Sequence, residues 1–70
     1  MENAVGRFGR NVKALRLEKR WTQEELADRS GLTPVQISRV ERGAREVRLT
    51  TLLRLMSALE TTPDRLLDGV

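Results

Sequence analysis

The sequence contains no cysteine and no histidine, and its aromatic residues are one tryptophan and one phenylalanine. Without cysteine the chain can form neither a disulfide nor a thiolate metal site. Acid–base or nucleophilic chemistry would fall on carboxylates, serines or lysines. The acidic cluster of Glu24, Glu25 and Asp28 lies near the start of an expected helix, where it complements the helix dipole. We therefore expect no enzyme, no cofactor and no bound metal.

Long hydrophobic runs are also missing. No apolar stretch approaches the roughly 20 residues of a membrane span, and the N-terminal sequence MENAVGRFGRN lacks the apolar core of a signal peptide. We expect a cytoplasmic protein without a membrane partner. Residues 1–70 suffice for one small domain, which buries only about 60% of its unfolded surface. Such a domain depends on helix packing, helped by self-association.

Arginine dominates the charged residues. The chain has 13 basic and 10 acidic residues, which gives a net charge of +3, and eleven of the basic residues are arginine. The planar guanidinium group suits phosphates and guanine edges because it donates two parallel hydrogen bonds. The same composition also fits a helical surface covered by salt bridges. Only the positions of the arginines, and not their number, can distinguish a nucleic-acid contact from a salt-bridged surface.

The hydrophobic pattern predicts an all-α bundle of five short helices. No segment alternates with period two over a useful length, so we expect no sheet. The expected helices cover about Val5–Glu18, Gln23–Ser30, Pro34–Arg42 and Leu49–Glu60, followed by a short one that Thr62 caps, Pro63 opens and Gly69 ends. Residues 1–5 are expected to be loose, and Gly6 and Gly9 weaken the start of the first helix.

Residues 22–43, TQEELADRSGLTPVQISRVERG, carry the most informative pattern. Each of the two helices in this stretch begins with a capping box, formed by Thr22 with Glu25 and by Thr33 with Gln36. Gly31 lies between the helices, where it accepts a positive φ at a sharp turn. Two helices that cross steeply at a short glycine-containing turn form a helix-turn-helix, whose second helix can enter a DNA major groove.

This stretch resembles the helix-turn-helix of the Cro and phage-repressor family, the lambda-repressor-like DNA-binding domains. The matching positions are Gln23, Leu26, Ala27, Gly31, Leu32, Ile37, Val40, Glu41, Arg42 and Gly43. The resemblance covers about residues 8–68, including the tail TTPDRLLDG. It implies a five-helix lambda-repressor-like bundle with the motif at about residues 23–42. One-domain members of this family include phage Cro-like repressors and the controller proteins of restriction–modification systems, and the sequence does not choose between them.

The second helix of the motif has an apolar and a polar face. At about 100° per residue, Ile37 and Val40 point into the bundle, and Arg39 points outward. The base-contacting positions of the family map onto Thr33, Pro34, Val35, Gln36, Ser38 and Arg39, although Pro34 has no side-chain donor. Val35 would touch a thymine methyl group. Gln36 is equally explained by its capping box, and the alternative for Arg39 is an ion pair with Glu46 or with a helix neighbour.

Phosphate contacts orient a protein on DNA without reading its sequence. We expect them from Arg10, Gln23, Arg42, Arg45 and Arg48. The last three are spaced by three across the loop after the reading helix. Gln23 begins the first helix of the motif, where the family grips a phosphate with the side chain and the helix amides. An ordinary solvated surface remains the alternative for each of them.

The expected functional unit is a homodimer that regulates transcription by binding a pseudo-palindromic operator in double-stranded DNA. Leu66 and Leu67 cannot both face so small a bundle, so we expect the dimer interface at Leu66, Leu67 and Val70; the alternative is that both leucines close the core. The chain shows no effector domain, so no small-molecule effector is expected. The rival hypothesis is a protein-interaction module or an antitoxin whose main partner is another protein.

Overall fold

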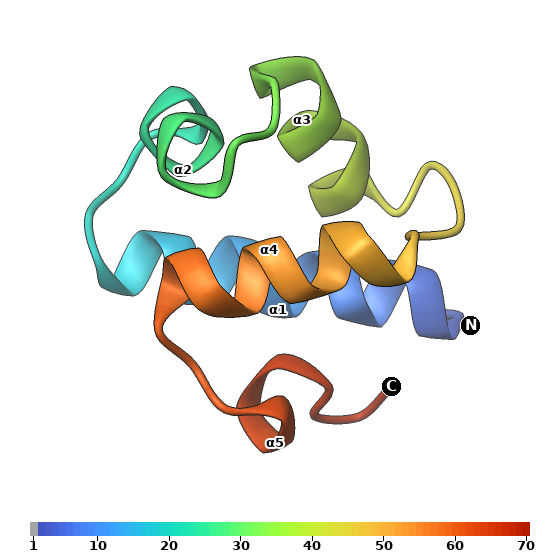
Figure 1. Ribbon diagram of the computed structural model, residues 1–70. Helices are drawn as coiled ribbons and strands as arrows, with labels where there is room; N and C mark the ends of the chain where they lie inside the picture. Colours follow the sequence, from blue (N-terminus) through green and yellow to red (C-terminus); the bar gives the residue numbers. More distant parts are fainter. Residues whose placement is uncertain (1) are drawn as a thin grey trace.

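The computed structural model describes residues 2–70, which form five α-helices (Figure 1). They are α1 (Ala4–Glu18), α2 (Gln23–Ser30), α3 (Pro34–Arg42), α4 (Leu49–Leu59) and α5 (Pro63–Leu66). In Figure 1, α1 and α4 cross the middle of the molecule, with α2 and α3 above them and α5 below. The predicted all-α bundle with a helix-turn-helix is confirmed. Among residues 2–70, no helix has the length and apolar character needed to cross a membrane.

Short polar side chains begin four of the five helices. Each accepts a hydrogen bond from the backbone N–H three residues further on, at the N-caps Asn3, Thr22, Thr33 and Thr62. Both capping boxes of the motif are complete. The N-cap of α4 is Arg48, which makes no such bond, and the first turn of α4 contains no acidic residue. The start of α4 therefore carries an uncompensated positive end of the helix dipole.

Left-handed residues end the helices of the motif. Gly31 has a φ of 73° and Gly43 a φ of 64°, as expected from their places after α2 and α3. Two later ends differ from the sequence-based expectation. Glu60 is the left-handed cap of α4 at a φ of 49° instead of its last residue, and α5 ends at Leu66, three residues before Gly69.

The first helix begins earlier than predicted. The expectation that the first residues are loose is wrong for Asn3 and Ala4, because Asn3 caps α1 and Ala4 is its first residue. The Asn3 side-chain oxygen accepts a hydrogen bond of 2.8 Å from the backbone N–H of Gly6. Met1 lies outside the described residues.

Gly9 is buried where α1 crosses α3. A Cβ atom at this position would collide with the carbonyl oxygen of Val40 and would lie 2.9 Å from that of Glu41. The sequence suggested only that Gly9 weakens its helix. In the structure the absence of a side chain lets the backbones of α1 and α3 approach closely.

Ten apolar side chains from all five helices make one core. They are Phe8, Val12 and Leu15, Leu26 and Ala27, Ile37 and Val40, Leu55 and Leu59, and Leu66. Leu66 has 0% exposure, so its assignment to the dimer interface is wrong. The turn of α5 directs it inward and leaves Leu67, at 39% exposure, on the surface.

The segment after α5 is tied to α1. The Asn11 side-chain amide donates hydrogen bonds of 2.9 and 2.8 Å to the carbonyl oxygens of Leu66 and Asp68. Arg7 donates a 3.0 Å hydrogen bond to the same Asp68 carbonyl and pairs with its carboxylate at 3.3 Å. These contacts close the bundle on the side opposite α2 and α3.

Candidate DNA-binding surface

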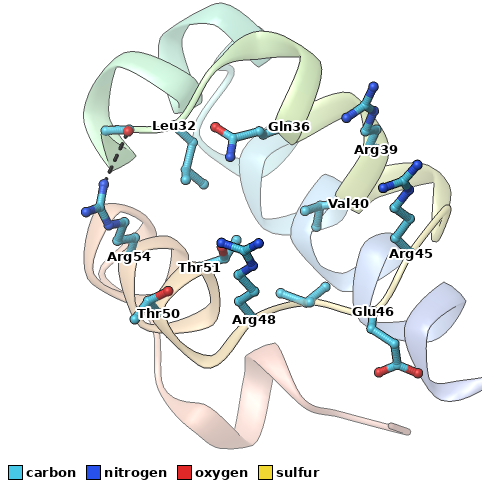
Figure 2. A pocket seen from close by; sticks show the side chains of 12 residues that line it. Leu32, Gln36, Arg39, Val40, Arg45, Glu46, Arg48, Thr50, Thr51 and Arg54 are labelled. Carbon is cyan, nitrogen blue, oxygen red and sulfur yellow. Dashed lines mark hydrogen bonds between the residues drawn. The ribbon is translucent and has the colours of Figure 1, made fainter.

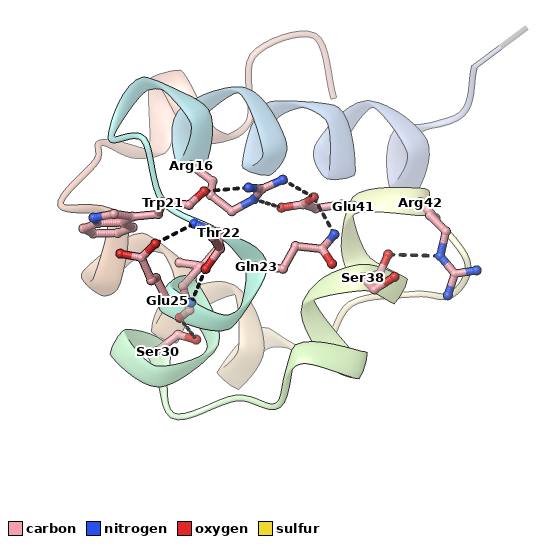
Figure 3. A network of polar contacts seen from close by, with 10 residues as sticks. Arg16, Trp21, Thr22, Gln23, Glu25, Ser30, Ser38, Glu41 and Arg42 are labelled. Atoms are coloured by element: carbon pink, nitrogen blue, oxygen red, sulfur yellow. Dashed lines mark hydrogen bonds and ion pairs between the residues drawn. The ribbon is translucent and has the colours of Figure 1, made fainter.

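A buried polar network fixes α2 and α3 relative to α1 (Figure 3). The Arg16 guanidinium donates to both carboxylate oxygens of Glu41, at 2.7 and 3.0 Å, and to the carbonyl oxygen of Trp21 at 2.6 Å. The side-chain nitrogen of Gln23 donates to Glu41 at 3.0 Å. Because Arg16 and Glu41 are both buried, neither can lose its partner without leaving an unpaired charge away from water.

This pair was not predicted from the sequence, where Glu41 was matched only as a family position and Arg16 was not singled out. A signal was present, since Arg16 follows Val12 by four residues and Glu41 follows Ile37 by four, which puts opposite charges on two buried stripes. Because the two residues are 25 positions apart, the sequence pattern did not indicate that they pair with each other.

Gln23 therefore also holds Glu41 in the buried network, in addition to the expected phosphate contact. An amide nitrogen carries two N–H groups, and Glu41 takes one of them. The other can still donate to a phosphate at the start of α2. The half-buried Gln23 is thus oriented by the network, unlike a freely rotating surface side chain.

The face of α3 that points outward agrees with the helical periodicity. Ile37 and Val40 are buried, whereas Val35 is 57% exposed. The neighbouring exposed residues are Thr33, Pro34, Gln36 and Arg39, and Ser38 is half-buried. The Gln36 side-chain oxygen accepts from the Thr33 backbone N–H at 2.8 Å, so its amide nitrogen is the end left for another partner.

A groove of about 460 Å³ separates α3 and its following loop from α4 (Figure 2). Among its lining residues are Gln36 and Arg39 of α3, Arg45 and Arg48 of the loop, and Thr50, Thr51 and Arg54 of α4. No ion pair between Arg39 and Glu46 is present in the described part of the chain, so this alternative explanation of Arg39 is wrong. The groove gathers four arginines against one glutamate, Glu46.

Three of the expected phosphate-contacting residues do not line this groove. Arg10 pairs with the carboxylate of Glu2 at 3.3 Å. Arg42 donates to the carbonyl oxygen of Ser38 at 3.2 Å, and Gln23 belongs to the buried network. Arg54, which was not among the expected contact residues, lines the groove instead. No local pattern marks it, because it lies outside the motif and reaches the groove only through the packing of α4.

The described residues offer no evident metal site, since no three acidic side chains come together among residues 2–70. What they offer is a two-helix unit with a capped α2, a left-handed glycine turn and an α3 whose exposed face borders a basic groove. These features define a helix-turn-helix DNA-binding domain of the kind found in transcription regulators.

The chain belongs to the helix-turn-helix family, whose sequence profile matches residues 12–66. It is 36% identical over 62 residues to the uncharacterized HTH-type transcriptional regulator YqaE of Bacillus subtilis (strain 168), covering 89% of this chain and 53% of that protein. The chain thus spans about half the length of this relative. It is 40% identical over 62 residues to the control protein C.BamHI of Bacillus amyloliquefaciens, covering 87% of this chain and 76% of that protein.

A solved structure similar to this fold is the restriction-modification controller protein C.AhdI from Aeromonas hydrophila. The TM-score is 0.84 and the sequence identity 40%, over 89% of this chain and 94% of that one. These relatives are named as regulators and controllers, not as enzymes.

Proposed function

We propose that this protein is a transcription regulator that binds a pseudo-palindromic operator in double-stranded DNA as a homodimer, with α3 of each subunit in the major groove. One observation carries the proposal: the outer face of α3 presents exposed Val35 and Arg39, and Arg39 has no acidic partner among residues 2–70. A thymine methyl group and a guanine edge are the partners that these two side chains fit. We place the protein in the cytoplasm.

Base contacts in this proposal come from Thr33, Val35, Gln36, Ser38 and Arg39. Thr33 and Gln36 first hold each other in the capping box, so both are oriented before DNA arrives. Such pre-ordering lowers the entropy lost on binding. Gln36 would donate to a base through its amide nitrogen, because its oxygen is engaged by Thr33.

Phosphate contacts are proposed for Gln23, Arg42, Arg45 and Arg48, and for Arg10 once it leaves Glu2. The pair of Arg10 with Glu2 is exposed, and such pairs contribute only about 0–1 kcal/mol. A phosphate can therefore replace the carboxylate of Glu2 at little cost.

The homodimer would use an apolar surface on α4 and the end of the chain. Leu49 is 69% exposed, and Leu53, one turn further along α4, is 52% exposed. Half-buried Leu52 of α4 also lines a small apolar groove of about 190 Å³ together with Leu67 and Val70. Apolar surface of this kind marks an interaction site, and two identical copies can cover each other in a two-fold dimer.

Selection of bound sequences from a random duplex pool tests the proposal. We expect an enriched motif with two half-sites whose centres lie about 34–36 Å apart. Affinity should fall by roughly 10³ to 10⁵ between 50 and 200 mM salt if 6–10 phosphates are contacted. A pool without enrichment, together with a flat salt dependence, would contradict the proposal.

Within this function we favour a controller of restriction–modification genes over a phage repressor. The support is the similarity to C.BamHI and C.AhdI, which carry controller names. The selected motif tests this point, because a controller's operator should lie next to restriction and modification genes in the source genome. A motif found only beside unrelated genes would contradict it.

A further inference from the structure

Arg54 forms one end of the basic groove. Its Nη1 atom donates a hydrogen bond of 3.3 Å to the carbonyl oxygen of Gly31, in the turn of the motif. Figure 2 shows Arg54 at one end of the groove and Arg39 and Arg45 at the other, with Arg48 between them. The side chain therefore reaches from α4 toward the reading helix and its turn.

The four arginines of this groove lack anions to match their charge. None of them takes part in an ion pair within residues 2–70. Arg54 uses one N–H on an uncharged carbonyl, and its other four donors remain available. Like charges repel one another when gathered on one surface. An anion bound in the groove would offset this repulsion, because each arginine would be attracted to it.

The walls of the groove favour a phosphate of DNA as that anion. One wall is the reading helix itself, through Gln36 and Arg39, and the opposite wall adds the hydroxyls of Thr50 and Thr51. With a volume of about 460 Å³, the groove has room for a phosphodiester with its sugars. A strand whose bases meet α3 would pass along the same groove.

We propose that Arg54, together with Arg48, binds a backbone phosphate of the DNA strand that runs between α3 and α4. This inference rests on the proposed function, and it adds a contact from α4 that lies outside the motif. The contact positions the duplex and carries no base information. The competing explanation is that Arg54 only braces the turn through Gly31.

The test compares the parent protein with Arg54→Gln, Arg54→Lys and Arg65→Gln. Arg65 is the matched control, because it lies on α5, on the side opposite α2 and α3, and pairs with Glu18 at 2.7 Å. Each variant is titrated at several salt concentrations with the selected operator and with an unrelated duplex. Melting curves of the four proteins report any change in folding.

We expect Arg54→Gln to weaken binding to both duplexes by the same factor, about tenfold for each subunit. The slope of log affinity against log salt should fall by about one for each lost contact, and Arg65→Gln should leave it unchanged. Arg54→Lys should keep most of the slope, because it keeps the charge. Replacing the contacted phosphate by a neutral methylphosphonate should weaken the parent more than Arg54→Gln, because only Arg48 still contacts that phosphate in the variant.

A lower melting temperature of Arg54→Gln with an unchanged salt slope would overturn the proposal in favour of a brace. Tight binding of inorganic phosphate at Arg54, followed by NMR, with DNA affinity independent of Arg54, would overturn the assignment to DNA. Failure of the proposed function would look different. The parent would then select no operator, whereas the unrelated duplex would still report the contribution of Arg54.

Discussion

Arg16 and Arg39 carry the same side chain in opposite surroundings. Arg16 is buried and its charge is matched by Glu41, so its contribution is to hold helices together. Arg39 is exposed, borders a groove and forms no ion pair within the described chain. The partner of an arginine, and not the residue type, separates a structural from a binding role in this arginine-rich chain.

Arg39→Ala should reduce affinity for the selected operator by about 1–3 kcal/mol for each half-site and relax the preference at one base pair. The reason is the loss of two parallel hydrogen bonds to a base edge. Titration against the operator and its single-base variants measures both effects. Arg45→Ala is the control, and it should weaken all sequences alike. Unchanged affinity and selectivity after Arg39→Ala would mean that α3 is oriented differently on DNA.

Gly9→Ala should destabilise the domain by about 1–3 kcal/mol or more, because the added methyl group meets two backbone carbonyl oxygens of α3. Gly6→Ala is the matched control. Its methyl group would approach only the side chains of Glu2 and Asn3, at 3.2 and 3.3 Å. Since alanine favours a helix over glycine by up to about 1 kcal/mol, Gly6→Ala should be neutral or stabilising. Urea unfolding measures the stability of both variants. Equal unfolding midpoints would contradict the close crossing of α1 and α3 at Gly9.

At the scale of the helices, local chemistry made the motif readable from the sequence. The bounds of α2 and α3 agree with the prediction because a capping box and a left-handed glycine act within a few residues of each helix end. The exposed face of α3 also followed from periodicity alone. The predicted ends of α4 and α5 were less accurate. For α4 the reason is that Glu60 takes a left-handed conformation, which is uncommon for a residue other than glycine.

Features that depend on distant contacts could not be read in this way. The pair of Arg16 with Glu41 joins residues 25 positions apart, and the role of Gly9 depends on α3 lying against it. The small size of the bundle suggested that Leu66 and Leu67 could not both face the core, but only the packing of α5 on α1 decides that Leu67 is the exposed one. The contact residues on DNA remain predictions.

Glu41→Ala should cost about 3–5 kcal/mol of stability, because it leaves Arg16 charged and buried without its partner. It should also free Gln23 and loosen the start of α2 against α3. Glu24→Ala, at an exposed position of α2, is the control and should change stability by a few tenths of a kcal/mol, roughly what a dipole interaction contributes.

Thermal unfolding of the two variants gives the comparison. The double variant Arg16→Met with Glu41→Leu should recover much of the loss, since apolar side chains often replace a buried pair without penalty. A single variant Glu41→Ala as stable as the parent would show that the pair does not hold the helices.

At the scale of the whole molecule, substitution of the exposed leucines should affect dimerisation without unfolding a single subunit. Leu53→Glu and Leu67→Glu should each remain folded, because both side chains already face solvent in one subunit. At least one of them should be monomeric and bind the operator far more weakly, since a single reading helix buries too little surface for strong discrimination. Leu66→Glu is the contrasting variant and should unfold, because Leu66 lies in the core.

Sedimentation with and without operator DNA, together with melting curves, distinguishes these outcomes. A parent protein that stays monomeric on DNA at saturating concentration would contradict the homodimer. Two folded variants that both remain dimeric would move the interface away from α4 and the end of the chain.

The tie between α1 and the segment after α5 has a consequence for the order of events during synthesis. Leu66 completes the core, and the carbonyl groups that Asn11 and Arg7 bind are those of Leu66 and Asp68. A ribosome adds about 5–20 residues per second, so α1 exists for seconds before these partners leave the ribosome. During that interval its apolar stripe is incompletely covered. The contacts of α1 with Leu66 and Asp68 can form only after the chain has been synthesised to α5 and beyond.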